Sequence, residues 1–327
     1  MKRSFTSWGS GSGLELKPEI TAPGGNIYSS VTDGKYDVNS GTSMAAPSVA
    51  GQAAVVAQYI KENGLAEKTG MTVRALAQSL MMGTATPVMD PEMEGVEYSP
   101  RRQGSGLANV EDAVNTPTYV TVNGYEDGKV KMEFGDDPDR DGTYSFSFQV
   151  HNMTDKAVTY KMSGSMLAPY VFEDSGTKYI ATSDINIDGD FAFVSGNSGF
   201  DPNGDGKLDT GDVMAILNYA VDQAQLEDPE SADFNGDGVT DEVDAQILND
   251  ILNGGSYNGI TLEILKGVNT VTVPANGTAS VTVTMSLSED GRAYMEENFV
   301  NGNYVEGYVY LDAVADAEGK VAVSQSI

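Results

Sequence analysis

Two short acidic loops hold the residues of this chain whose types and spacing are most clearly arranged for chemistry. The first spans residues 201–212 and the second residues 233–244. In both, side-chain oxygens occupy loop positions 1, 3, 5, 9 and 12, glycine occupies position 6, and a backbone carbonyl is available at position 7. An all-oxygen set with this spacing is typical of a Ca²⁺-binding loop. The predicted ligands of two calcium ions are Asp201, Asn203, Asp205, Lys207, Asp209 and Asp212, then Asp233, Asn235, Asp237, Val239, Asp241 and Asp244, with Lys207 and Val239 offering carbonyls.

The alternative interpretation of these loops is a solvated acidic linker. Residues 199–255 contain 14 acidic residues against one basic residue, Lys207. Clustered carboxylates repel one another unless cations neutralise them. Two copies in the same register, each followed by an apolar stripe at helical spacing, favour calcium binding over a linker.

The paired loops and the amphipathic segments that follow them resemble a type I dockerin over residues 199–255. The resemblance implies a small α-helical module that binds a cohesin on a cellulosome-type scaffold. In that family loop positions 10 and 11 face the cohesin, which gives Thr210 and Gly211 in the first repeat and Glu242 and Val243 in the second. The Ser-Thr pair familiar at these positions is absent and the two repeats differ. The type of cohesin and interchangeable docking in two orientations therefore stay open.

Two further segments begin like calcium loops. They are residues 137–142 (Asp-Pro-Asp-Arg-Asp-Gly) and residues 184–189 (Asp-Ile-Asn-Ile-Asp-Gly). Phe148 and Ser195 stand where the closing carboxylate belongs, and strand patterns follow instead of helices. We predict acidic hairpin turns, with weak calcium binding as the alternative.

Residues 40–47, Ser-Gly-Thr-Ser-Met-Ala-Ala-Pro, precede a long apolar segment at helical spacing. Gly41 permits a tight turn, and Ser43 falls where free N–H groups and the positive helix end can stabilise an oxyanion. A helix-capping serine would explain Ser43 alone but not the whole string. The string resembles the nucleophile motif of subtilisin-like serine proteases, and residues 4–115 resemble the C-terminal portion of a lactocepin-like catalytic domain. The resemblance implies that Ser43 is the catalytic nucleophile.

The rest of the catalytic machinery is expected outside this sequence. The same resemblance implies a histidine, an aspartate and an oxyanion-hole asparagine, which we expect upstream of Met1. The lone histidine, His151, follows a strand pattern and is predicted to be a neutral histidine near the surface. Without a base a serine hydroxyl stays protonated, so this chain alone is expected to be inactive.

The predicted fold class is multidomain. Helical patterns over Ser43–Asn63 and Thr72–Thr84 fit the C-terminal part of an α/β subtilisin-like domain, and alternating runs after residue 117 resemble a fibronectin type III-like β-sandwich. Glycines at positions 196, 199, 254 and 255 are expected to act as joints for an inserted module. The predicted domains are residues 1–117 (subtilisin-like part), 118–198 (first part of the sandwich), 199–255 (dockerin-like module) and 256–327 (second part of the sandwich, expected to be cut short).

Composition excludes several classes of protein. Acidic residues outnumber basic ones by 48 to 19, for a formal net charge of −29, which argues against binding to nucleic acid or anionic membranes. The absence of cysteine excludes disulfides and thiolate sites, and a single histidine excludes a zinc site built on several histidines. No apolar run is long enough to span a membrane.

The leading hypothesis is a secreted subtilisin-like endopeptidase, acting on proteins or peptides and tethered to an extracellular or cell-surface scaffold through calcium-dependent cohesin binding. The alternative is a non-catalytic, calcium-stabilised cohesin-binding adaptor. A polysaccharide hydrolase is disfavoured, because no segment outside the calcium loops suggests the paired carboxylates of a carbohydrase.

Overall fold

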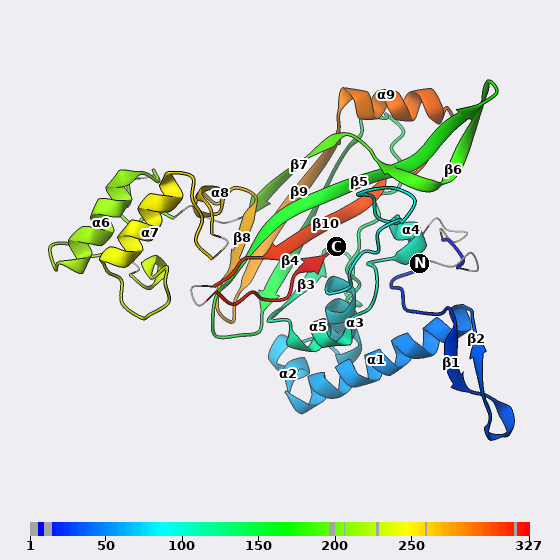
Figure 1. Cartoon of the computed structure of the whole chain (residues 1–327), viewed down its shortest axis with the longest axis horizontal. Helices are drawn as coiled ribbons and strands as arrows, with labels where there is room; N and C mark the ends of the chain where they lie inside the picture. Colours follow the sequence, from blue (N-terminus) through cyan, green and yellow to red (C-terminus); the bar gives the residue numbers. More distant parts are fainter. Residues whose placement is uncertain are drawn as a thin grey trace.

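The computed structural model places a helical N-terminal part beneath a β-sandwich, with a small helical module at one end of the sandwich (Figure 1). Among the described residues no helix is both long and apolar enough to cross a bilayer. The described residues are 6–9, 15–195, 200–205, 207–226, 229–258, 260–316 and 319–327.

The N-terminal part is built on one long helix, α1 (Thr42–Glu62), and a hairpin that precedes it. Its core forms where α1 packs on α3 and α5 through buried residues such as Val56, Ile60 and Leu76. The helices predicted over Ser43–Asn63 and Thr72–Thr84 are present as α1 and α3. The remaining elements are β1 (Ile27–Ser30), a 3-10 turn (Thr32–Gly34), β2 (Tyr36–Asn39), α2 (Leu65–Thr69), α3 (Val73–Gly83), α4 (Pro100–Gln103) and α5 (Val110–Asn115).

The sandwich consists of two antiparallel sheets. One has the order β11-β10-β5-β6, with β8 also paired to β5, and the other has the order β3-β4-β9-β7. Alternating residues such as Phe148 and Val150 of β4 and Val281 and Val283 of β9 fill the core between the sheets. The strands are β3 (Thr118–Val122), β4 (Thr143–Asn152), β5 (Val158–Asp174), β6 (Thr177–Asn186), β7 (Gly189–Ser195), β8 (Thr270–Val273), β9 (Thr278–Leu287), β10 (Glu306–Ala313) and β11 (Gln325–Ser326), and helix α9 (Glu289–Asn298) follows β9.

The two halves of the sandwich come from both sides of the inserted module, since β8 to β11 follow it in the chain. The last residues join a sheet: Gln325 pairs with Leu311, and Ser326 pairs with Tyr310. An antiparallel sandwich is therefore present, while its assignment as a fibronectin type III domain stays a prediction.

The inserted module is formed by α6 (Thr210–Ala220), a 3-10 turn (Glu230–Ala232), α7 (Glu242–Leu252) and α8 (Leu262–Leu265). Ile216 of α6 and Leu248 of α7 are fully buried between the helices. Leu265 belongs to the same apolar cluster, so this core extends beyond residue 255. The predicted joints at Gly196 and Gly199 lie outside the described residues.

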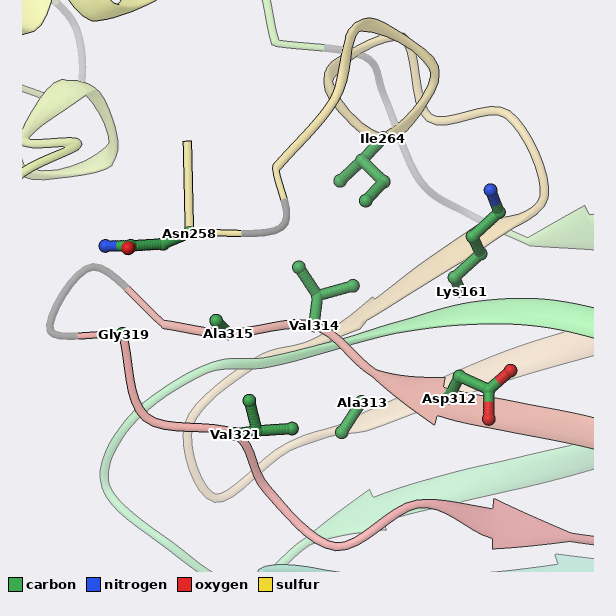
Figure 2. Close-up of a pocket in the computed structure, with 9 residues that line it drawn as sticks. All are labelled: Lys161, Asn258, Ile264, Asp312, Ala313, Val314, Ala315, Gly319 and Val321. Carbon is green, nitrogen blue, oxygen red and sulfur yellow. The ribbon is translucent and has the colours of Figure 1, made fainter. Parts of the chain in front are cut away.

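The module contacts the sandwich sparsely. The exposed Lys161 of β5 and Glu263 of α8 form an ion pair at 3.4 Å. A cavity of about 470 Å³ lies between Ile264 on the module side and the chain that follows Asp312 (Figure 2). The module is therefore joined at one end of the sandwich and is not embedded in it.

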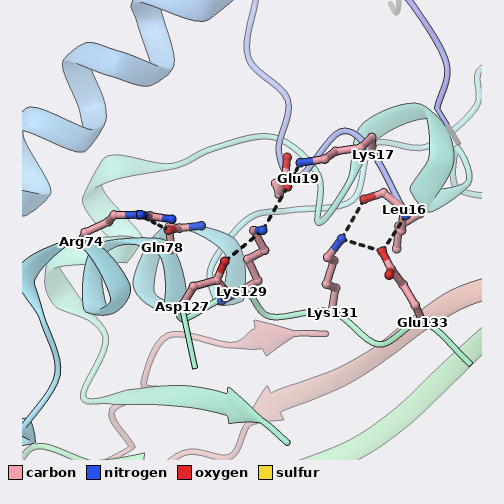
Figure 3. Close-up of polar contacts among 9 residues, drawn as sticks. All are labelled: Leu16, Lys17, Glu19, Arg74, Gln78, Asp127, Lys129, Lys131 and Glu133. Carbon is pink, nitrogen blue, oxygen red and sulfur yellow. Dashed lines mark hydrogen bonds and ion pairs between the residues drawn. The ribbon is translucent and has the colours of Figure 1, made fainter. Parts of the chain in front are cut away.

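Contacts at several places fasten the N-terminal part to the sandwich. In one, an extended N-terminal segment lies along the chain before β4: Leu16 N–H donates to Glu133, and Lys131 donates both to Glu133 and to the Leu16 carbonyl (Figure 3). Burial raises the pKa of Glu133, but the hydrogen bonds from Lys131 and Leu16 outweigh it, and its pKa lies below the ordinary value.

Another junction between the two parts is a buried ionic cluster. Arg101 contacts Glu306 at 2.8 Å and Asp184 at 3.7 Å, and Arg102 contacts Asp184 at 3.8 Å. The Arg102 guanidinium also lies over the Trp8 ring, 3.9 Å from its centroid. Residues from α4, β6, β10 and the N-terminal segment thus meet at one point.

Candidate functional site

Ser43 lies in the first turn of α1, as the sequence predicts, and its side chain is exposed. Pro47 lies inside the same helix and has no N–H to donate to the Ser43 carbonyl. Because Ser43 lies in the first turn, its hydroxyl is near the end of the helix where backbone N–H groups have no partner within the helix.

The turn before Ser43 is fixed by a neighbouring loop. Gly41 N–H donates to the Gly24 carbonyl at 2.8 Å, and Asn26 N–H donates to Ser40 Oγ at 2.8 Å. A Cβ atom on Gly24 would lie 2.6 Å from the Gly41 carbonyl oxygen, so the close approach requires glycine. These contacts hold the start of α1 in one position.

His151 lies in β4, within the sandwich. Its Nε2 is 2.8 Å from Thr121 Oγ1, its Nδ1 is 2.9 Å from Thr278 Oγ1, and its ring stacks on Tyr119. Burial lowers the pKa of His151, which favours the neutral imidazole. Both ring nitrogens are therefore engaged by threonine hydroxyls of the flanking strands.

The first acidic loop folds around its own carboxylates. Asp201 accepts hydrogen bonds from the N–H groups of Gly204 and Asp205, and Asn203 Oδ1 accepts a second bond from Asp205 N–H. Asp205 in turn accepts from Lys207 N–H at 2.9 Å. Gly206, the predicted turn glycine, lies outside the described residues.

The second loop repeats this scheme. Asp233 accepts from the N–H groups of Gly236 and Gly238, Asn235 accepts from Asp237 N–H, and Asp237 accepts from Val239 N–H. The bonds donated by Gly236, Asp237 and Val239 N–H are equivalent to those donated by Gly204, Asp205 and Lys207 N–H in the first loop, so the two repeats share this part of their hydrogen bonding.

The last carboxylate of each loop closes it. Asp212 and Asp244 are fully buried, and each accepts from the N-cap N–H of the following helix and from N–H groups near the loop start. The N-caps, Asp209 and Asp241, complete capping boxes with them. The carboxylate predicted at position 12 therefore ties the loop to its helix.

The donor set of both loops fits a hard cation, because every predicted ligand offers oxygen. Burial raises the pKa of Asp212, hydrogen bonds from the Asp209 and Asn203 N–H groups lower it, and the nearby charges of Asp201 and Asp205 raise it, so the net pKa lies above the ordinary value. In the described part of the chain, no group of three or more His, Cys, Asp or Glu side chains is gathered as a preformed metal centre. The carboxylates instead accept hydrogen bonds from their own loops.

The predicted partner-binding residues lie in the first turns of the two helices. Thr210, Glu242 and Val243 are exposed, and Gly211 is half-buried. Met214, which the spacing of the loop residues does not single out, is 52% exposed one turn after Thr210. Met214 lies off the apolar stripe of α6, and this position in the sequence predicts that its side chain is exposed.

The first aspartates of the two incomplete calcium loops make different contacts. Asp137 accepts from Tyr144 OH at 2.9 Å and Gly142 N–H at 3.1 Å, which stabilises a turn. Asp184 is buried against Arg101 and Arg102 and is therefore part of the ionic cluster.

Fold and sites together define a chain with a serine at a helix start and a double acidic-loop helical module inserted in a β-sandwich. Residues 2–106 match the subtilase family, and residues 199–253 match the dockerin type I domain. The resemblance to subtilisin-like proteases and to dockerins is therefore confirmed.

Individual relatives agree with the subtilase match. The chain is 34% identical to the PII-type proteinase of Lactococcus lactis subsp. cremoris over 193 residues, which cover 56% of this chain and 10% of that protein. It is 37% identical to the C5a peptidase of Streptococcus pyogenes serotype M6 over 152 residues, or 46% of this chain and 12% of that protein. The chain thus spans about a tenth of the length of the curated relatives it matches.

Proposed function

We propose that this chain supplies the nucleophile of an extracellular subtilisin-like serine endopeptidase and an inserted anchor that binds a cohesin in a calcium-dependent manner. The observation that carries the catalytic part is the exposed Ser43 in the first turn of α1, within the segment that matches the subtilase family. In the complete enzyme Ser43 Oγ attacks the peptide carbonyl to form an acyl-enzyme, which water then hydrolyses.

The base that activates Ser43 is proposed to come from the part of the catalytic domain outside this sequence. The sequence contains one histidine, and both nitrogens of His151 bond to threonines. Beside Ser43, α1 exposes small residues at Pro47, Ala50 and Ala54, a surface on which the remaining catalytic domain can pack.

In the anchor, the two loops are proposed to hold one calcium ion each through the side chains and carbonyls predicted from the sequence. The ions supply positive charge that neutralises the clustered carboxylates. The support is that both loops fold alike and that Asp212 and Asp244 tie each loop to its helix.

The cohesin surface is proposed to include Thr210, Met214, Glu242 and Val243, which are exposed on the two helices. The two helices present different chemistry, since Met214 of α6 corresponds to Gln246 of α7. A partner that recognises one helix is therefore expected to discriminate it from the other.

A fluorophosphonate probe tests the catalytic proposal. A longer protein that includes the preceding catalytic domain should label at Ser43, and labelling should vanish in Ser43→Ala but persist in the control Ser48→Ala. This chain alone should label weakly or not at all. Strong labelling of this chain, or unlabelled Ser43 in the folded longer protein, contradicts the proposal.

The second candidate is the non-catalytic adaptor, which the threonine-bonded state of His151 favours for this chain by itself. Capture on a cohesin panel that disappears with chelator, combined with absent proteolysis by the longer protein, supports the adaptor. Proteolysis that requires Ser43 excludes it.

A further inference from the structure

The outer side of α6 carries an exposed methionine. Thr210, Met214 and Val221 follow one another at intervals of four and seven residues, so they lie on the same side of this helix. Thr210 is exposed, Met214 is 52% exposed, and Val221, the C-cap residue, is 60% exposed. Helix α6 lies on the side of the module away from the sandwich (Figure 1). We call these three residues the α6 outer face.

The α6 outer face is uncharged although the module around it is strongly acidic. The structure describes every residue of α6, and the one charged side chain among them, Asp212, is fully buried. Residues 199–255 nevertheless contain 14 acidic residues. An adaptable thioether on an uncharged, partly apolar face is typical of a surface that binds another protein.

The second repeat shows that the fold does not require methionine at this position. Met214 corresponds to Gln246, which is exposed on α7. The apolar contacts that hold the two helices together come instead from residues such as Ile216 and Leu248. A polar group at residue 214 is therefore expected to change the surface of the module and to leave its core intact.

The thioether of Met214 is open to reversible oxidation. A hydroperoxide transfers one oxygen atom to the sulfur: the O–O bond breaks, an S–O bond forms, the sulfur loses two electrons, and the peroxide is reduced to water or an alcohol. Methionine sulfoxide reductases return the polar sulfoxide to the thioether. The chain has no cysteine to compete for the oxidant, and among the described methionines Met89, at 48%, is the other one of comparable exposure.

We propose that Met214 is a reversible oxidation site that controls docking of the inserted module. In the thioether form its side chain packs against apolar atoms of the cohesin. In the sulfoxide form the same contact buries a polar S–O group that finds no hydrogen-bond donor, so binding weakens. The inference rests on the cohesin binding proposed above and is independent of Ser43.

Peroxide treatment of the whole chain tests the proposal. The chain is incubated with hydrogen peroxide in the presence of calcium, freed of peroxide by gel filtration, and bound to a cohesin that captures the untreated chain in the panel. Peptide mass spectrometry should show Met214 and Met89 oxidised before the buried methionines, and circular dichroism should show an unchanged fold. The Kd for the cohesin should rise by about tenfold or more, and methionine sulfoxide reductase should restore it.

Three variants assign the effect to residue 214. Met89→Leu, the matched control at the other exposed methionine, should show the same peroxide-induced rise in Kd as the wild-type chain. In Met214→Leu the Kd after treatment should equal the Kd before it, whatever that starting value is. Met214→Gln introduces the side chain of the second repeat, so it should fold and should bind the cohesin about as weakly as the oxidised chain.

The outcomes separate this inference from the proposed function. If no cohesin captures the untreated chain, both are overturned. If capture occurs but the Kd is unchanged when Met214 is fully oxidised, the oxidation site is overturned and cohesin binding stands. The same conclusion follows if Met214 stays reduced while Met89 is oxidised, or if Met214→Leu loses affinity on treatment as the wild-type chain does.

Discussion

Asp184→Asn should be among the most destabilising conservative substitutions in this chain. Asp184 is 3% exposed and Arg102 is 5% exposed, and the two lie 3.8 Å apart at the junction between the N-terminal part and the sandwich. Loss of the carboxylate charge removes one ionic partner of the buried Arg102 guanidinium. Removal of one member of a buried ion pair typically costs about 3–5 kcal/mol.

The structure places the expected loss at the lower end of this range, about 3 kcal/mol. Burial raises the pKa of Asp184 even though Arg102 and Arg101 lower it, so the ionised carboxylate itself is incompletely stabilised. Arg101 retains Glu306 at 2.8 Å, and Arg102 retains the Trp8 ring. These remaining contacts are expected to limit the loss in the free energy of unfolding.

Urea denaturation of the wild-type chain and the variant measures the change in the free energy of unfolding. Glu263→Gln serves as the matched control, because its partner Lys161 lies at 3.4 Å and their side chains are 69% and 47% exposed. Exposed pairs contribute about 0–1 kcal/mol. A loss below about 0.5 kcal/mol for Asp184→Asn, similar to the control, would refute the reasoning about the buried cluster.

Two other outcomes follow from local contacts. Burial raises the pKa of Asp137, but hydrogen bonds from Tyr144 and loop N–H groups lower it more. This carboxylate therefore contributes stability above its unfolded-state pKa and loses it as the pH falls through the lower folded-state pKa. Tyr144→Phe should raise the pKa of Asp137 in a carboxyl NMR titration, and an unchanged pKa would contradict the assigned bond. In Gly164→Ala the new Cβ would lie 2.4 Å from the Phe191 ring, and urea denaturation should show a loss of about 1–3 kcal/mol. Gly51→Ala, on the exposed side of α1 with no atom near its Cβ, should instead gain about 0.5–1 kcal/mol, and equal effects of the two substitutions would rule out this packing argument.

Features encoded by local periodicity could be predicted from the sequence. Helices α1 and α3, the alternating strands β4 and β9, and the loop-helix repeats all follow from residue spacing within a single segment. The position of Ser43 at the start of α1 follows from the same local reasoning.

Features created by distant segments could not be predicted. The Arg101–Glu306 pair joins residues 205 positions apart, and no pattern in either segment specifies its partner. Asp184 illustrates the same limit, because the local pattern predicts an acidic turn and does not indicate that this carboxylate lies against two arginines far away in the sequence. The point along β5 where β8 ends and β6 begins likewise depends on strand register, which no single segment specifies.

The inserted module shows both kinds of feature. Its paired loops were predicted from the repeat, yet Leu265 joins its core from beyond the repeat. Four residues, Leu262–Leu265, form a helix too short to recognise by periodicity, and only packing against the repeat reveals their role.

Calcium titration calorimetry of the whole chain tests the anchor most directly. The chain is expected to take up two ions, one for each loop, and to lose both sites in the double variant Asp205→Ala and Asp237→Ala. The same double substitution at exposed acids outside the loops, Asp222→Ala and Asp250→Ala, should preserve both sites. Absence of calcium uptake by the wild-type chain, or uptake unaffected by loss of the two loop aspartates, would contradict the claim that these repeats form a calcium-dependent anchor.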